Sequence, residues 1–217
     1  MQVIYCIAGL GADENIFRFL DLSFANTVFL YWITPLPNET LREYALRLKN
    51  EFIHEPDPII LGLSLGGMLA VEIAKSIPTA KAIIISSAKT RNEIPSYLKM
   101  LRYMPVYKIL PRSSRKKFLN IQQYFLGAYS NLAKQYLLDA IEKADQKFYK
   151  WAVGAILTWQ NQTVPLNIVH IHGTNDKLLP YKFVKADIPV NNAGHLMIIE
   201  NASEISFLLR RVFNQWF

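Results

Sequence analysis

The chain of 217 residues contains a single cysteine, Cys6. One thiol excludes an internal disulfide framework, so we expect a reducing, cytoplasmic location. Cys6 lies in an apolar stretch, which is typical of core packing rather than of reactivity. No basic region precedes this stretch and Gly9-Leu10-Gly11 interrupts it early, so we expect no signal peptide. No run of about 18 apolar residues occurs, and we predict no transmembrane helix.

Charged residues make up only 19% of the chain, against 51% for hydrophobic residues. This balance excludes a disordered chain, and the length predicts one domain with a substantial core. The net charge of +7 is unevenly distributed: residues 89–160 carry 13 basic and 4 acidic side chains (+9), and the other residues carry 11 and 13 (−2). The positive charge therefore belongs to one segment.

The densest basic cluster in that segment is Arg112-Ser113-Ser114-Arg115-Lys116-Lys117. Most such clusters form the solvated face of a helix. The alternative is that the cluster attracts an anionic substrate, an acyl group on an acidic carrier protein or coenzyme A, or an anionic membrane surface. No recognised nucleic-acid-binding module accompanies the charge, so we do not expect a nucleic acid as partner.

Apolar stretches of strand length alternate with helical patterns along most of the chain. This alternation predicts an α/β fold, with a mostly parallel sheet covered by helices on both faces. Six strands are expected, at 3–7, 27–33, 59–63, 80–86, 166–172 and 185–190. Helices are expected at 15–20, 39–52, 65–77 and 203–214.

Residues 89–160 interrupt the alternation, because their pattern predicts only helices. These helices are expected near 93–104, 114–127, 131–144 and 146–160. We interpret 1–88 and 161–217 as the core of a single domain, and 89–160 as a helical lid inserted over the carboxyl ends of the strands. Most of the aromatic residues of the insertion are expected to pack with one another.

The most informative stretch is Gly62-Leu63-Ser64-Leu65-Gly66, which joins the expected strand at 59–63 to the expected helix at 65–77. A serine on such a sharp turn takes strained backbone geometry, and the glycines allow strand and helix to pass closely. The hydroxyl then lies at a helix N-terminus, which favours negative charge. The pattern indicates a nucleophile, although by itself it also fits a serine that only caps a helix.

Two further residues follow expected strands in the same way. Asp176, in Gly173-Thr174-Asn175-Asp176, comes after the fifth strand, and His195, in Gly194-His195, comes after the sixth. Each residue alone fits an ordinary turn or surface position. The chain order Ser, Asp, His, with each residue directly after a strand, is typical of a catalytic triad.

With these motifs, with Pro180, and with Gly9-Leu10-Gly11 after the first strand, the chain resembles the α/β-hydrolase family. The resemblance covers nearly the whole chain, and residues 89–160 stand where the family carries a variable lid. It implies a sheet order of 2-1-3-4-5-6, which brings Leu10 and Ser64 to the point where the strand order reverses. One departure is Ala8, because many members have histidine before the first glycine of this loop.

The resemblance also implies a role for each site residue. Ser64 would be the nucleophile, His195 would take its proton and later deliver it, and Asp176 would orient the imidazole and stabilise its charged form. The backbone N–H groups of Leu10 and Leu65 would form the oxyanion hole. No cofactor and no metal ion are expected.

The remaining histidines receive structural interpretations. His170 and His172 share one face of the fifth strand, and their spacing suits a metal ion, but the sequence offers no third ligand nearby. His54 precedes Pro56 in an expected loop and is interpreted as a surface residue.

The sequence therefore predicts a serine hydrolase that acts on a small-molecule carboxylic ester or thioester through an acyl-enzyme intermediate. Two alternatives stay open. One is a hydrolase-shaped binding protein with little turnover, and the other is a carbon–carbon bond hydrolase or lyase on the same scaffold.

Overall fold

A single six-stranded parallel sheet forms the centre of the computed structural model, which describes residues 2–103 and 119–216. The strand order is β2-β1-β3-β4-β5-β6, and all five neighbouring pairs are parallel. The predicted α/β sheet and its strand order are therefore confirmed. The strands are β1 (Val3–Ile7), β2 (Asn26–Phe29), β3 (Ile59–Leu63), β4 (Lys81–Ile85), β5 (Ile168–Gly173) and β6 (Ile188–Val190).

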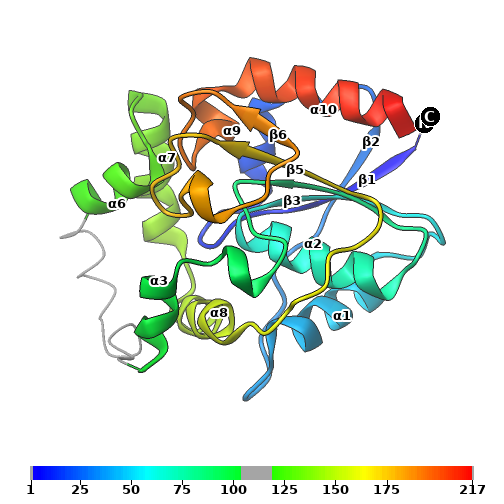
Figure 1. Ribbon diagram of the computed structural model, residues 1–217, viewed down its shortest axis with the longest axis horizontal. Coiled ribbons are helices and arrows are strands. Elements are labelled where there is room, and N and C mark those ends of the chain that lie inside the picture. Colours follow the sequence, from blue (N-terminus) through cyan, green and yellow to red (C-terminus); the bar gives the residue numbers. More distant parts are fainter. Residues whose placement is uncertain (1, 104–118, 217) are drawn as a thin grey trace.

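Helices cover both faces of the sheet, as the continuous apolar strands require. On one face, α10 (Ala202–Trp216), the short α9 (Met197–Glu200) and the 3-10 helix η1 (Glu14–Phe19) pack on β1, β3 and β4. On the other face lie α1 (Leu41–Phe52) and α2 (Leu65–Ser76). Figure 1 shows α10 above the sheet and α1 and α2 below it. Two apolar layers therefore hold the strands in place.

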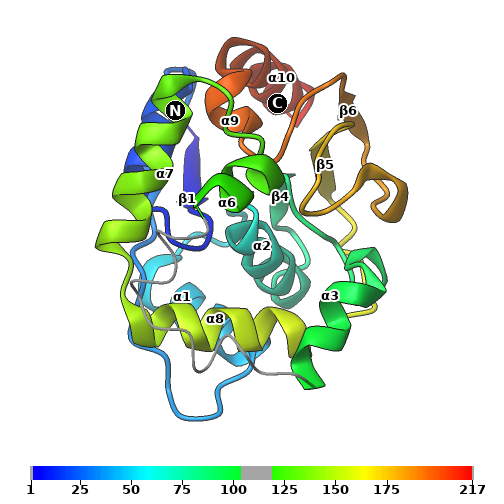
Figure 2. The same ribbon diagram turned by 90° about the vertical axis from the view of Figure 1, so that its left-hand side faces the viewer.

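Every regular element that the structure describes between β4 and β5 is a helix. Its longer helices are α6 (Leu119–Leu126), α7 (Asn131–Lys143) and α8 (Gln146–Thr158). Figure 1 and Figure 2 show them toward the side where the strands end. The basic cluster at 112–117 and the start of the helix predicted near 114–127 lie outside the described residues.

The helix predicted near 93–104 is wrong in its extent. The described part of this stretch consists of η2 (Arg91–Glu93), α3 (Ser96–Met100) and η3 (Leu101–Tyr103). Pro95 separates the first two pieces, because it has no N–H to donate and it disfavours the helical conformation at the residue before it. Ile94 is accordingly extended, with φ −82° and ψ 124°.

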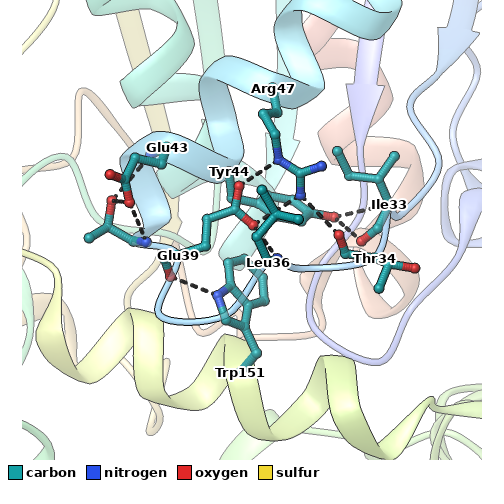
Figure 3. Close-up of polar contacts among 9 residues, drawn as sticks. Ile33, Thr34, Leu36, Glu39, Glu43, Tyr44, Arg47 and Trp151 are labelled. Carbon is teal, nitrogen blue, oxygen red and sulfur yellow. Dashed lines mark hydrogen bonds and ion pairs between the residues drawn. The ribbon is translucent and has the colours of Figure 1, made fainter.

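Helix α8 is fastened to the core by the contacts shown in Figure 3. The Trp151 indole N–H donates to the Glu39 carbonyl oxygen at 2.8 Å, and the Arg47 guanidinium pairs with the Glu39 carboxylate at 2.6 Å. The Trp151 and Tyr44 rings lie 4.3 Å apart, and the Trp159 indole N–H donates to Glu72 of α2 at 2.7 Å. Trp151 and Trp159 therefore pack on core helices. The expected packing within the insertion is seen for two ring pairs, Phe148–Trp151 and Tyr124–Phe125, whose centroids lie 5.4 and 5.5 Å apart.

Cys6 is 1% exposed, so the expectation that it packs in the core is confirmed, and burial raises the pKa of its thiol. Within residues 2–103 and 119–216, no helix is both long enough and apolar enough to span a membrane.

Candidate active site

Ser64 lies on the sharp turn between β3 and α2, with φ 52° and ψ −115°. A non-glycine residue with positive φ is strained, and it persists only where its surroundings fix it. The Ser64 N–H donates to the Ile85 carbonyl at 2.9 Å, and the Ser87 hydroxyl donates to the Ser64 carbonyl at 2.7 Å. These contacts from the end of β4 hold the turn, so the serine is placed by a neighbouring strand as well as by its own motif.

Two glycines allow this turn to form against β1. A Cβ atom added to Gly66 would lie 2.1 Å from the Ile7 carbonyl oxygen, and one added to Gly62 would lie 2.3 Å from the Gly66 carbonyl oxygen. Both distances are far inside van der Waals contact with backbone atoms that cannot rotate away. Glycine at these positions therefore lets α2 begin directly beside the ends of β1 and β3.

Asp176 lies in the turn that follows β5 and is 3% exposed. Its Oδ1 atom accepts the backbone N–H groups of Leu178 and Leu179, each at 2.8 Å. Burial is the largest single effect on the pKa of this carboxyl and raises it, but His195, through its charge and its hydrogen bond, together with His172 and the Leu179 N–H, lowers the pKa by more. The net pKa lies below the ordinary value, so Asp176 is a carboxylate at neutral pH.

His195 lies between β6 and α9 and is also 3% exposed. Backbone hydrogen bonds join its loop to the turn of the acid: Asn175 N–H donates to the Ala193 carbonyl and Thr174 N–H to the Val190 carbonyl, both at 2.9 Å. The relative position of Asp176 and His195 is therefore set by main-chain contacts.

The three side chains meet in one hydrogen-bonded row. His195 Nδ1 lies 2.7 Å from Asp176 Oδ2, and His195 Nε2 lies 3.0 Å from Ser64 Oγ. Because the carboxylate only accepts, Nδ1 carries the proton and Nε2 is free to accept the serine proton. Chemically, the row can deprotonate a hydroxyl at a helix N-terminus.

The two leucines proposed for the oxyanion hole flank this row in the chain. Leu65 is the first residue of α2, where a backbone N–H has no partner within the helix. Leu10 lies inside a turn that the Ala12 N–H closes onto the Gly9 carbonyl at 3.0 Å. A Cβ atom added to Gly9 would lie 3.4 Å from Ser64 Cβ, so this turn passes directly beside the serine.

Sequence reasoning missed two groups that support the site. Ser87 holds the Ser64 carbonyl, and Gly127, after α6, passes so close to Gly194 that a Cβ atom on Gly127 would lie 3.1 Å from the Gly194 Cα. The Leu196 N–H also donates to the Leu126 carbonyl at 2.8 Å. The strand order could have indicated Ser87, because β4 ends beside β3, but no sequence pattern marks the 126–127 contact.

A cavity of about 780 Å³ lies beside the first loop. Residues 10–13, residues 32–35 and the junction of α7 and α8 contribute to its lining, with charged side chains of both signs. None of the three side chains of the row lines this cavity, although Leu10 does. The cavity therefore borders the candidate oxyanion loop rather than the serine itself.

His170 and His172 are completely buried on β5, and His54 is exposed. Among the residues that the structure describes, no three His, Cys, Asp or Glu side chains are grouped to hold a metal ion.

One known family matches most of the chain. Residues 6–206 match the profile of the alpha/beta hydrolase family. The chain belongs to this family. No curated protein matches the chain at a significant level.

Solved structures with the same fold include two esterases and a meta-cleavage product hydrolase. The esterase from Thermogutta terrifontis has a TM-score of 0.79 at 14% identity, over 99% of this chain and 90% of its own. The esterase from Exiguobacterium antarcticum has a TM-score of 0.69 at 16% identity, over 98% of this chain and 92% of its own. The meta-cleavage product hydrolase from Pseudomonas fluorescens has a TM-score of 0.65 at 17% identity, over 100% of this chain and 92% of its own. At these identities the likeness concerns the fold of the α/β hydrolase.

Proposed function

We propose that this α/β hydrolase cleaves a carboxylic ester or thioester through an acyl-enzyme intermediate. The observation that carries the proposal is the row Ser64–His195–Asp176, with distances of 3.0 and 2.7 Å, at the N-terminus of α2. This arrangement has the order, spacing and burial that nucleophilic catalysis by serine needs. The names of the esterases with the same fold are consistent with it.

In the proposed reaction, Ser64 Oγ attacks the carbonyl carbon while His195 Nε2 takes the hydroxyl proton. Asp176 stays ionised and stabilises the imidazolium that results. The N–H groups of Leu10 and Leu65 stabilise the oxyanion. The intermediate collapses with loss of the alcohol or thiol, which receives the proton from His195, and a water molecule activated by the same histidine then releases the acid and regenerates Ser64.

The first test is covalent labelling with a fluorophosphonate probe. The wild-type protein should be labelled stoichiometrically, because an activated serine attacks the phosphorus centre, and Ser64→Ala should not be labelled. A panel of esters, thioesters and vinylogous diketones then separates the possible reactions. Labelling without turnover of any ester or thioester would favour a binding protein, and selective cleavage of the diketones would favour carbon–carbon bond hydrolysis.

We also propose that residues 89–160 act as a lid, with 1–88 and 161–217 as the core. Contacts of the insertion with the candidate site support this division, since the Leu126 carbonyl accepts the Leu196 N–H directly after His195. Trp151 of α8 donates to the Glu39 carbonyl, just before α1, and packs against Tyr44 of α1, so we assign α8 as the fixed base of the lid.

The charge of the lid leads to a prediction about salt. Residues 89–160 carry +9 and the rest of the chain −2, so long-range attraction of an anionic or carrier-bound substrate must come from this segment. For such a substrate, kcat/KM should fall with added salt, since charges act over about 8 Å at physiological ionic strength. Replacing Arg112, Arg115, Lys116 and Lys117 together with glutamine should reproduce the loss. The control is a small neutral ester, and an equal salt response for both substrates would contradict the prediction.

A further inference from the structure

The two buried histidines of β5 continue the row of the candidate site on the far side of its acid. His172 Nε2 lies 2.8 Å from the Leu179 carbonyl oxygen and 3.4 Å from Asp176 Oδ2, the same oxygen that contacts His195. His172 Nδ1 lies 3.1 Å from His170 Nε2. Both imidazoles are fully buried, and the proposed mechanism uses neither of them.

The proton positions in this pair follow from the chemistry of the partners. A carbonyl oxygen only accepts, so His172 Nε2 carries the proton that it donates to Leu179. Burial, as the largest cause, lowers the pKa of His172, and it lowers that of His170 further, so both rings are neutral at pH 7. The unprotonated Nδ1 of His172 therefore accepts the Nε2–H of His170. His170 thus fixes the tautomer of His172.

Burial, more than the charged and titratable groups around the pair, keeps both rings neutral. His172 faces Asp176 on the following turn, His195 beyond it and His170 on its own strand, while Lys89, after β4, acts on His170. The Asp176 carboxylate and the hydrogen bond to the Leu179 carbonyl favour a positive charge on His172, but burial is the largest effect on its pKa and opposes that charge. The Nε2–H of the neutral His172 ring therefore lies beside the Asp176 carboxylate without forming a second ion pair with it.

The backbone of Leu179 links His172 to Asp176. The Leu179 carbonyl accepts the His172 proton, and the Leu179 N–H donates to Asp176 Oδ1 at 2.8 Å. Leu179 is itself 5% exposed within the apolar layer of α1 and α2. The His172 imidazole thus holds the turn 176–179, and His170 sets the orientation of His172. This turn determines where Asp176 Oδ2 contacts His195.

We propose that His172, oriented by His170, is a positioning residue for the Asp176 carboxylate in the reaction of Ser64. This inference rests on the proposed function. His172 touches no reacting atom, and its role is to keep Asp176 Oδ2 at the position where it accepts the hydrogen bond of the His195 Nδ1–H group. A small displacement of a catalytic group costs up to about 100-fold in rate, which sets the scale of the expected effect.

The test compares His172→Gln with His172→Asn. The asparagine amide lies near the position of His172 Nδ1, where its oxygen can still accept the His170 N–H, but only glutamine carries its N–H₂ far enough from the backbone to reach the Leu179 carbonyl. We expect His172→Asn to lower the rate constant of fluorophosphonate labelling and kcat by about 10- to 100-fold with KM little changed, and His172→Gln to restore most of this loss. Thermal unfolding of both variants verifies that they are folded.

A double-mutant cycle separates positioning from a general packing role. In the Asp176→Asn background, His172→Asn should have almost no further effect on the labelling rate, because there is no carboxylate left to position. The inference would be overturned if the effects of His172→Asn and Asp176→Asn on the labelling rate multiplied in the double variant. It would also be overturned if His172→Gln and His172→Asn had equally low labelling rates. If the wild type is labelled and Ser64→Ala is not, normal rates in His172→Asn overturn the inference alone. If the wild type is not labelled at all, the proposed function fails and the inference fails with it.

Discussion

Replacing Ser64 with alanine should lower kcat for ester or thioester hydrolysis by about 10⁴-fold or more. In the proposed mechanism the substitution removes the atom that forms the acyl-enzyme, while the turn is still held by the Ile85 and Ser87 contacts to the Ser64 backbone. Steady-state kinetics with the best ester of the substrate panel measure the loss. Ser76→Ala is the matched control, since Ser76 ends the same helix and its hydroxyl only bonds the Ile73 carbonyl.

The other two members of the row should respond as parts of one unit. His195→Ala should lower kcat by a similar factor, and Asp176→Asn by a comparable or smaller one with the fold retained, because the amide still accepts from the Leu178 and Leu179 N–H groups. The Ser64→Ala, His195→Ala double variant should be no slower than either single variant. Near wild-type turnover in Ser64→Ala would falsify the proposed mechanism.

The second large effect concerns stability. Gly66→Ala should destabilise the folded state by about 3 kcal/mol or more, because the new methyl group would lie 2.1 Å from the Ile7 carbonyl oxygen and 2.4 Å from that of Ala8. For a chain of this size, such a loss lowers the melting temperature by roughly 6–12 °C. Differential scanning calorimetry measures the shift.

Gly9→Ala is the control for this prediction. Its methyl group would meet Ser64 Cβ at 3.4 Å, an ordinary van der Waals contact. Its melting temperature should therefore stay close to that of the wild type. Equal melting temperatures for the two variants would mean that the end of β1 and the start of α2 can separate without loss of stability. The close approach of these elements would then not explain why residue 66 is glycine.

The fold was predictable where a single pattern decided an element. The continuous apolar residues of β3 and the helical spacing after Ser64 predicted Ile59–Leu63 and Leu65–Ser76 to within a residue. The stretch near 93–104 was not predictable from apolar spacing, because Pro95 broke the helix. The short α9 was also missed, since four residues are too few to show a helical period.

The three residues of the candidate site were selected by their order along the chain and by the strands before them. Their catalytic roles remain predictions, but the structure brings Ser64 and Asp176 to the same imidazole, that of His195. The first loop was selected by resemblance, and Gly9 in it lies against Ser64. Each buried strand can be recognised from its own local sequence. Because the carboxyl ends of parallel strands lie at one edge of the sheet, residues that directly follow these strands lie near one another, so their order along the chain was sufficient to select them.

The sequence by itself determined the sheet, the strained turn of Ser64 and the choice of Asp176 and His195, because each depends on neighbouring residues or on a strand that directly precedes it. Only the tertiary structure decided what surrounds them. Ser87 reaches the Ser64 carbonyl from another strand, Trp151 binds the insertion to a core carbonyl, and His172 lies beneath the turn of the acid. Each of these contacts joins side chains to backbone groups across elements, and such pairings follow from packing in three dimensions, which no local sequence pattern encodes.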